Sequence, residues 1–129
     1  FQILYKPKKL TPINGVTATT VSEPIYMGYA KKATLLLERT GHASGSVIFT
    51  VQAALDYSDG GDFIPEVNMI SNDVNNHSQT LERNRTVELN ANGKVMVALD
   101  LEHFGYEYIQ IKATESGVGT STVKMLIQE

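Results

Sequence analysis

The strongest constraint on this chain is a regular alternation of apolar and polar side chains over residues 46–57. One parity is apolar and comprises Val47, Phe49, Val51, Ala53, Leu55 and Tyr57. The other parity is mostly polar and comprises Ile48, Thr50, Gln52, Ala54 and Asp56. A period of two residues is that of a β-strand with one buried face. The chain must therefore pack at least one sheet against a core.

The same period recurs along the chain and is interrupted by turn residues such as those at 58–61 and 90–93. It predicts about eight or nine strands spaced roughly 8–12 residues apart, which is typical of an antiparallel sandwich or barrel. No segment has a convincing helical pattern. We therefore expect an all-β, jelly-roll-like or immunoglobulin-like sandwich. Its core should include Val47, Phe49, Val51, Leu99, Ile109, Ile111 and Val123.

Two segments fit this pattern less well. Residues 63–70 are interrupted by Pro65, so they are expected to form at most an edge strand. Residues 71–84 are rich in Asn and Ser and are expected to form a long exposed loop.

The expected domain organisation is one sandwich over residues 16–129, preceded by an extended arm over residues 1–15. A chain of 129 residues fits one domain with a sizeable core. Pro7 and Pro12 disfavour a central strand, and Lys6, Lys8 and Lys9 disfavour burial. The arm is expected either to leave the sandwich or to lie along its edge.

Charge is distributed unevenly. Residues 1–32 contain five lysines and one acidic residue, Glu23, and so have a net charge of +4. Residues 33–129 have a net charge of −7, and the two parts sum to the chain's −3. A basic leading segment can bind the acidic body of a neighbouring copy. The alternative is an ordinary solvated tail.

The sequence offers little for catalysis or for metal binding. It contains no cysteine, which excludes a disulfide scaffold and a cysteine-ligated zinc site. The histidines are isolated and no serine has a nucleophile pattern, so we expect no enzyme and no cofactor. Asp56, Asp59 and Asp62 could hold Ca²⁺ or simply cap a solvated hairpin. Because the body is acidic and basic residues are sparse, we expect no nucleic-acid partner. The sequence has no apolar run long enough to span a membrane as a helix, so we expect no membrane partner.

A set of apolar or amphipathic side chains occupies positions of outward parity. It comprises Ile48, Met96, Tyr106, Tyr108 and Leu126. If these residues are neighbours, they form a patch that another subunit covers; alternatively, some strands are buried on both faces. Tyr26, Met27 and Tyr29 suit an interface or a core equally well. Together with Lys6, Lys8 and Lys9, these eight residues make up the candidate interface.

Four segments carry a resemblance to a known class of proteins. Residues 22–25, 41–51, 58–61 and 106–114 resemble, in their order of strands and turns, the small β-sandwich virion proteins of tailed bacteriophages. The chain departs from that pattern at Asp62, which precedes the first aromatic residue after the turn, and at Gln110, where an arginine is frequent. The resemblance implies a virion-located capsid decoration, minor head or tail protein. It also implies a homo-oligomer, with a trimer as the working expectation, that docks on other virion proteins without catalysis.

A second hypothesis comes from a different functional class. A carbohydrate-binding or adhesion module is also built on a β-sandwich, and it stacks sugars on aromatic side chains. The chain has no tryptophan, but Tyr106 and Tyr108 could provide such a surface. A stable multimer would favour the structural role, whereas a monomer that binds glycans would favour the module.

Overall fold

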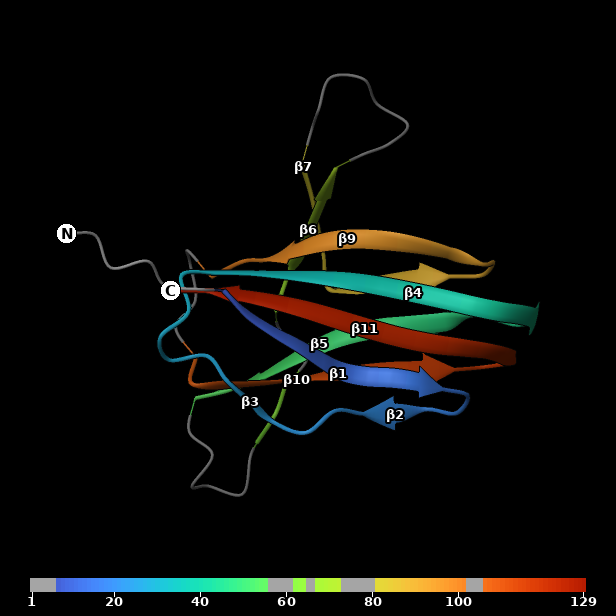
Figure 1. Cartoon of the computed structure of the whole chain (residues 1–129), viewed down its shortest axis with the longest axis horizontal. Helices are drawn as coiled ribbons and strands as arrows, with labels where there is room; N and C mark the ends of the chain where they lie inside the picture. Colours follow the sequence, from blue (N-terminus) through green and yellow to red (C-terminus); the bar gives the residue numbers. More distant parts are fainter. Residues whose placement is uncertain (1–6, 56–61, 65–66, 73–80, 102–105) are drawn as a thin grey trace.

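The computed structural model describes residues 7–55, 62–64, 67–72, 81–101 and 106–129. In this part of the chain it contains eleven strands and no helix. The strands form two antiparallel sheets that pack face to face (Figure 1). The all-β sandwich expected from the sequence is therefore confirmed.

The larger sheet has six strands in the order β1-β11-β4-β9-β6-β7. Their bounds are Lys8–Val16, Val118–Gln128, Lys32–Ser44, Gly93–Leu99, Met69–Asn72 and Leu81–Asn84. The smaller sheet has the order β2-β10-β5-β8, and β3 also pairs with β10. Their bounds are Thr20–Val21, Tyr108–Glu115, Val47–Ala54 and Thr86–Leu89, with β3 at Ile25–Tyr26. Figure 1 shows the long strands β4 and β11 side by side across the molecule.

The core lies between the two sheets and follows the alternation read from the sequence. Every core residue predicted from the pattern is buried: Val47, Phe49, Val51, Leu99, Ile109, Ile111 and Val123. The parity breaks at the end of β5, where Ala54 is buried and Leu55 is 79% exposed. Leu55 follows the last residue of the strand, so the strand period no longer determines its direction.

The described part of the N-terminal segment lies along an edge of the sandwich. Residues 8–15 belong to β1, which pairs with β11 along one edge of the larger sheet. This is one of the two placements expected for the arm, along an edge of the sandwich, and Ile13 also packs into the core. Residues 1–6, including Lys6, lie outside the described residues.

The structure has more strands than expected, because a hairpin overlaps the segment predicted to be a loop and β1 forms within the predicted arm. β6 and β7 pair with each other at either end of residues 71–84. Ser71, Asn72, Glu82 and Asn84 give this hairpin a polar composition, so the sequence lacks the alternation that marks a half-buried strand.

Two connections carry the chain from one sheet to the other at the same end of the molecule. The first joins β4 to β5 through Gly45, and the second joins β10 to β11 through Gly117. Gly45 has a φ of 69°, a value that disfavours other residues. A Cβ on Gly117 would lie only 2.2 Å from the carbonyl oxygen of Ser44. The two corners are therefore packed backbone against backbone.

Candidate functional site

A buried ion pair joins the two sheets at this double corner. Arg39, from β4, has a fully buried side chain, and Glu115, from the end of β10, has a side chain only 5% exposed. Arg39 Nη1 lies 2.5 Å from Glu115 Oε1, and Nη2 lies 3.1 Å from Oε2. This two-pronged geometry is the stronger form of an arginine–carboxylate contact.

The remaining polar atoms around the pair are also satisfied. Arg39 Nη2 donates to the carbonyl oxygens of Ser44 and Val118, and Arg39 Nε donates to His42 Nδ1 over 3.0 Å. The backbone N–H of Gly117 donates to Glu115 Oε2. The Arg39 side chain lowers the pKa of Glu115 through their hydrogen bond, which keeps the carboxylate ionised. Each guanidinium nitrogen already has a protein partner, so the pair is suited to holding the corners together rather than to binding a substrate.

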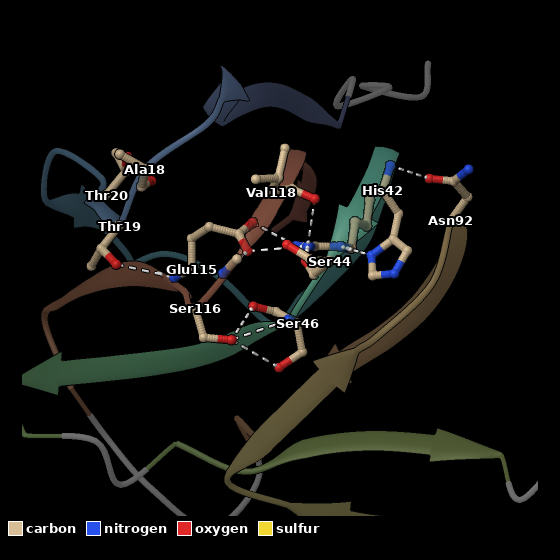
Figure 2. Close-up of polar contacts among 12 residues, drawn as sticks. Ala18, Thr19, Thr20, His42, Ser44, Ser46, Asn92, Glu115, Ser116 and Val118 are labelled. Atoms are coloured by element: carbon tan, nitrogen blue, oxygen red, sulfur yellow. Dashed lines mark hydrogen bonds and ion pairs between the residues drawn. The ribbon is translucent and has the colours of Figure 1, made fainter.

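Hydroxyl groups reinforce the same corner from the surface. The Ser116 hydroxyl accepts from the N–H of Ser46 and donates to its carbonyl oxygen, both over 3.1 Å (Figure 2). The N–H of Glu115 donates to the Thr19 hydroxyl. Figure 2 also shows Asn92 accepting from the backbone N–H of His42. These hydrogen bonds involve the β1–β2, β4–β5, β8–β9 and β10–β11 connections, which all lie at one end of the sandwich.

Sequence reasoning missed this pair, although a signal was present. Arg39 continues the inward parity of Ala33, Leu35 and Leu37, and Glu115 continues that of Ile109 and Ile111. An arginine and a glutamate at inward positions near strand ends indicate a buried ion pair, because neither charge is buried alone.

Three tyrosines of the candidate interface cluster beside β3 and β10. The Tyr26 and Tyr108 ring centroids lie 5.4 Å apart in an edge-on arrangement, and those of Tyr26 and Tyr29 lie 5.7 Å apart. Tyr26 is 47% exposed. A groove between β1 and the β3 segment runs beside Tyr26, with Leu10 and Pro12 on one side and Glu23 and Pro24 on the other. This tyrosine cluster is thus an accessible aromatic surface.

Two other candidate residues belong to the interior. Met27 is 4% exposed and is part of the core. Tyr106 packs against the core, and its buried hydroxyl makes no hydrogen bond with any residue that the structure describes. Burial raises the pKa of Tyr106, and the Asp100 carboxylate raises it further. The parity that placed Tyr106 outward does not apply, because β10 begins two residues later at Tyr108.

Met96 and Leu126 lie on the outer face of the larger sheet. We call the outward side chains of β1, β11, β4 and β9 the β4 face. Where β11 pairs with β4, Leu126 is opposite Thr34 and Lys124 is opposite Leu36. Where β4 pairs with β9, Leu36 is opposite Met96. Met96 is 65% exposed, and Leu36 and Leu126 are partly exposed. Leu36, which was not among the candidate interface residues, joins Met96 and Leu126 to form an apolar centre.

Ile48 lies on the outer face of the other sheet, opposite Thr114 and Glu88. The outward apolar set therefore does not form one continuous patch: Met96 and Leu126 lie on one side of the sandwich, and Ile48, Tyr26 and Tyr108 lie on the other. Lys8 and Lys9 are exposed at the edge strand β1.

The remaining candidate residues give no further site. His42 is held by Arg39, whereas His77, His103, Asp56 and Asp59 lie outside the described residues. Over the described ranges, His, Asp and Glu side chains form no group that could hold a metal ion. No helix in these ranges is long and apolar enough to cross a membrane.

Comparison with known proteins identifies a shared fold. No protein-family model matches the chain, and no curated protein sequence matches it. Among solved structures, the fold is similar to that of the SPBc2 prophage-derived protein YomS, with a TM-score of 0.60 and 12% sequence identity. The match covers 99% of this chain and 100% of the other. The two chains therefore share a fold over the matched residues.

Proposed function

We propose that this chain is a non-enzymatic structural protein of a tailed bacteriophage. In this role it self-associates and docks on a viral capsid or tail, as a decoration, minor head or tail component. The observation that carries the proposal is the full-length match to a prophage-derived protein of the same architecture. The match spans 99% of this chain and 100% of the other, so the likeness concerns the whole sandwich rather than a part of it.

The surfaces support an assembly role. The β4 face has an apolar centre of Leu36, Met96 and Leu126, and the opposite side of the sandwich exposes Tyr26 beside a groove. Apolar patches that lie between polar side chains mark protein–protein contacts. The closed ion pair of Arg39 and Glu115 supports the non-enzymatic part of the proposal, because its polar atoms are used to join strands.

The proposal is tested by fractionating phage particles from the strain that encodes the chain. We expect the protein to sediment with intact particles and to remain bound after nuclease treatment. Light scattering on the purified protein should show a multimer. Recovery only in the soluble fraction, together with a monomeric mass, would contradict the proposal.

Glycan binding is a second candidate, and the tyrosine cluster favours it. Tyr26 and Tyr108 lie near a polar pair in which Gln110 donates to Gln52 over 2.6 Å. Aromatic rings beside amide groups suit the apolar face and the hydroxyls of a sugar. Under this alternative, nuclear magnetic resonance titration with oligosaccharides would shift the Tyr26 and Tyr108 signals, and Tyr26→Ala would abolish the shift.

A further inference from the structure

The chain contains two Asn-Gly sequences, Asn14-Gly15 and Asn92-Gly93, and all four residues are exposed. An asparagine followed by glycine is prone to spontaneous deamidation, because no side chain shields the glycine nitrogen that attacks the asparagine amide. Glycine also permits the close backbone approach that the attack needs. The fold holds the two sequences differently, so we do not expect them to react equally.

Asn14-Gly15 lies at an irregularity of the edge strand β1. The register of β1 with β11 shifts between Ile13 and Val16, so Asn14 and Gly15 fall where two residues oppose one. Gly15 has a φ of 64°, and its N–H donates to the exposed Thr122 hydroxyl over 3.1 Å. No described residue hydrogen-bonds the Asn14 side chain. The amide that is attacked is therefore free, and the attacking nitrogen is bonded to a side chain at a break in the ladder.

Asn92-Gly93 is held at both reacting groups. Asn92 Oδ1 accepts from the backbone N–H of His42 over 2.8 Å, which fixes the direction of the side-chain amide (Figure 2). Gly93 is the first residue of β9 and is paired with Arg39 of β4. The Arg39 side chain is in turn fixed by its buried ion pair with Glu115. Attack at Asn92 therefore requires local opening of the β8–β9 connection.

We propose that Asn14 is a site of spontaneous deamidation in the folded protein, whereas Asn92 is protected by the fold. In the first step the Gly15 nitrogen forms a bond to Asn14 Cγ as the Cγ–Nδ2 bond breaks. The Gly15 amide proton leaves with the side-chain nitrogen as ammonia, and a cyclic imide remains. Water then opens the imide at one of its two carbonyl carbons and leaves aspartate or isoaspartate at position 14.

Either product adds one negative charge to the chain's net charge of −3, so ion exchange separates it from the starting protein. Because Asn14 is exposed, the aspartate form should melt at the wild-type temperature. The isoaspartate form lengthens the backbone of β1 beside Ile13, which packs into the core, and should melt at a lower temperature. The inference does not depend on the proposed function.

The test compares the two sites in the full wild-type chain, folded and in guanidinium chloride. The buffer is mildly alkaline, because the attacking nitrogen must lose its proton, and peptide mapping by mass spectrometry follows both conversions. Dividing each folded rate by the rate in denaturant removes the contribution of the flanking sequence. This normalised rate should be about tenfold higher at Asn14 than at Asn92, which corresponds to about 1.4 kcal/mol of additional opening free energy at Asn92.

Two results would overturn the inference. One is a normalised rate at Asn92 equal to or above that at Asn14. The other is an Asn14 that stays intact in the folded chain over a time in which the denatured chain reacts completely.

The variant Thr122→Val tests the hydrogen bond to the attacking nitrogen. It removes the hydroxyl and keeps the branched shape, so conversion at Asn14 should become faster while conversion at Asn92 is unchanged. Thr120→Val, on the same strand, is the control and should leave both rates unchanged. Circular dichroism and thermal melting check that both variants fold. An unchanged rate at Asn14 in Thr122→Val would contradict the role of this hydrogen bond.

Discussion

Phe49 and Ile48 are consecutive residues of β5 with opposite surroundings. Phe49 is fully buried, whereas Ile48 is partly exposed on the outer face. Phe49→Ala should lower the free energy of unfolding by about 3–5 kcal/mol, because it removes buried surface and leaves a cavity. Ile48→Ala is the matched control and should cost less. If urea denaturation gives equal losses of unfolding free energy for the two variants, the assignment of inner and outer faces to β5 is wrong.

Gly119 is required by the packing of Arg39. A Cβ at this position would lie 2.5 Å from Arg39 Cζ, and the guanidinium cannot move aside without losing its buried hydrogen bonds. Gly119→Ala should therefore destabilise the protein by about 1–3 kcal/mol, the usual cost of overpacking. Gly93→Ala is the control, since nothing lies within 4 Å of the added methyl. Thermal melting compares the two variants. Equal melting midpoints for Gly119→Ala and Gly93→Ala would contradict the close packing of Gly119 against Arg39.

At the scale of elements, the buried ion pair joins the β4–β5 and β10–β11 corners. Glu115→Ala would leave the Arg39 charge buried without its partner and should cost about 3–5 kcal/mol. Replacing both residues, as Arg39→Met/Glu115→Leu, should cost less, because no unpaired charge remains. Denaturant unfolding of both variants measures the difference. A double variant less stable than Glu115→Ala would show that the polar network itself supplies the stability.

The same pair predicts how stability depends on pH. Hydrogen bonding to Arg39 holds the pKa of Glu115 below its ordinary value of 4.5, so folding favours the ionised form. The resulting stabilisation is fully present above that ordinary value and is lost as the pH falls through the lower, folded pKa. Glu115→Gln should flatten this acid-side decrease in unfolding free energy. An unchanged acid profile in the variant would exclude Glu115 as its source.

The elements also show which parts of the fold can be predicted from sequence. β4, β5, β10 and β11 are half-buried, so their alternation follows directly from burial of one face. The hairpin of β6 and β7 has a polar composition and gives no such pattern. Individual outward residues are predictable, but their grouping is not. Whether Leu126 lies near Leu36 or near Ile48 depends on strand order, which parity does not encode.

At the scale of the whole molecule, apolar and charged contributions to assembly can be separated. Burying a side chain such as Leu126 is worth about 1.5–3 kcal/mol, whereas an exposed ion pair gives about 0–1 kcal/mol. The apolar centre of the β4 face should therefore supply most of the affinity, with the exposed lysines of β1 selecting orientation and partner. High salt should weaken assembly less than Leu126→Ser does.

The most direct measurement of the central claim is sedimentation equilibrium of the wild type, Leu126→Ser and the control Thr114→Ser. We expect the wild type and the control to form the same multimer, and Leu126→Ser to shift the protein toward monomer at low and high salt alike. A wild type that remains monomeric throughout, or a multimer that dissociates in salt yet is unaffected by Leu126→Ser, would contradict this claim.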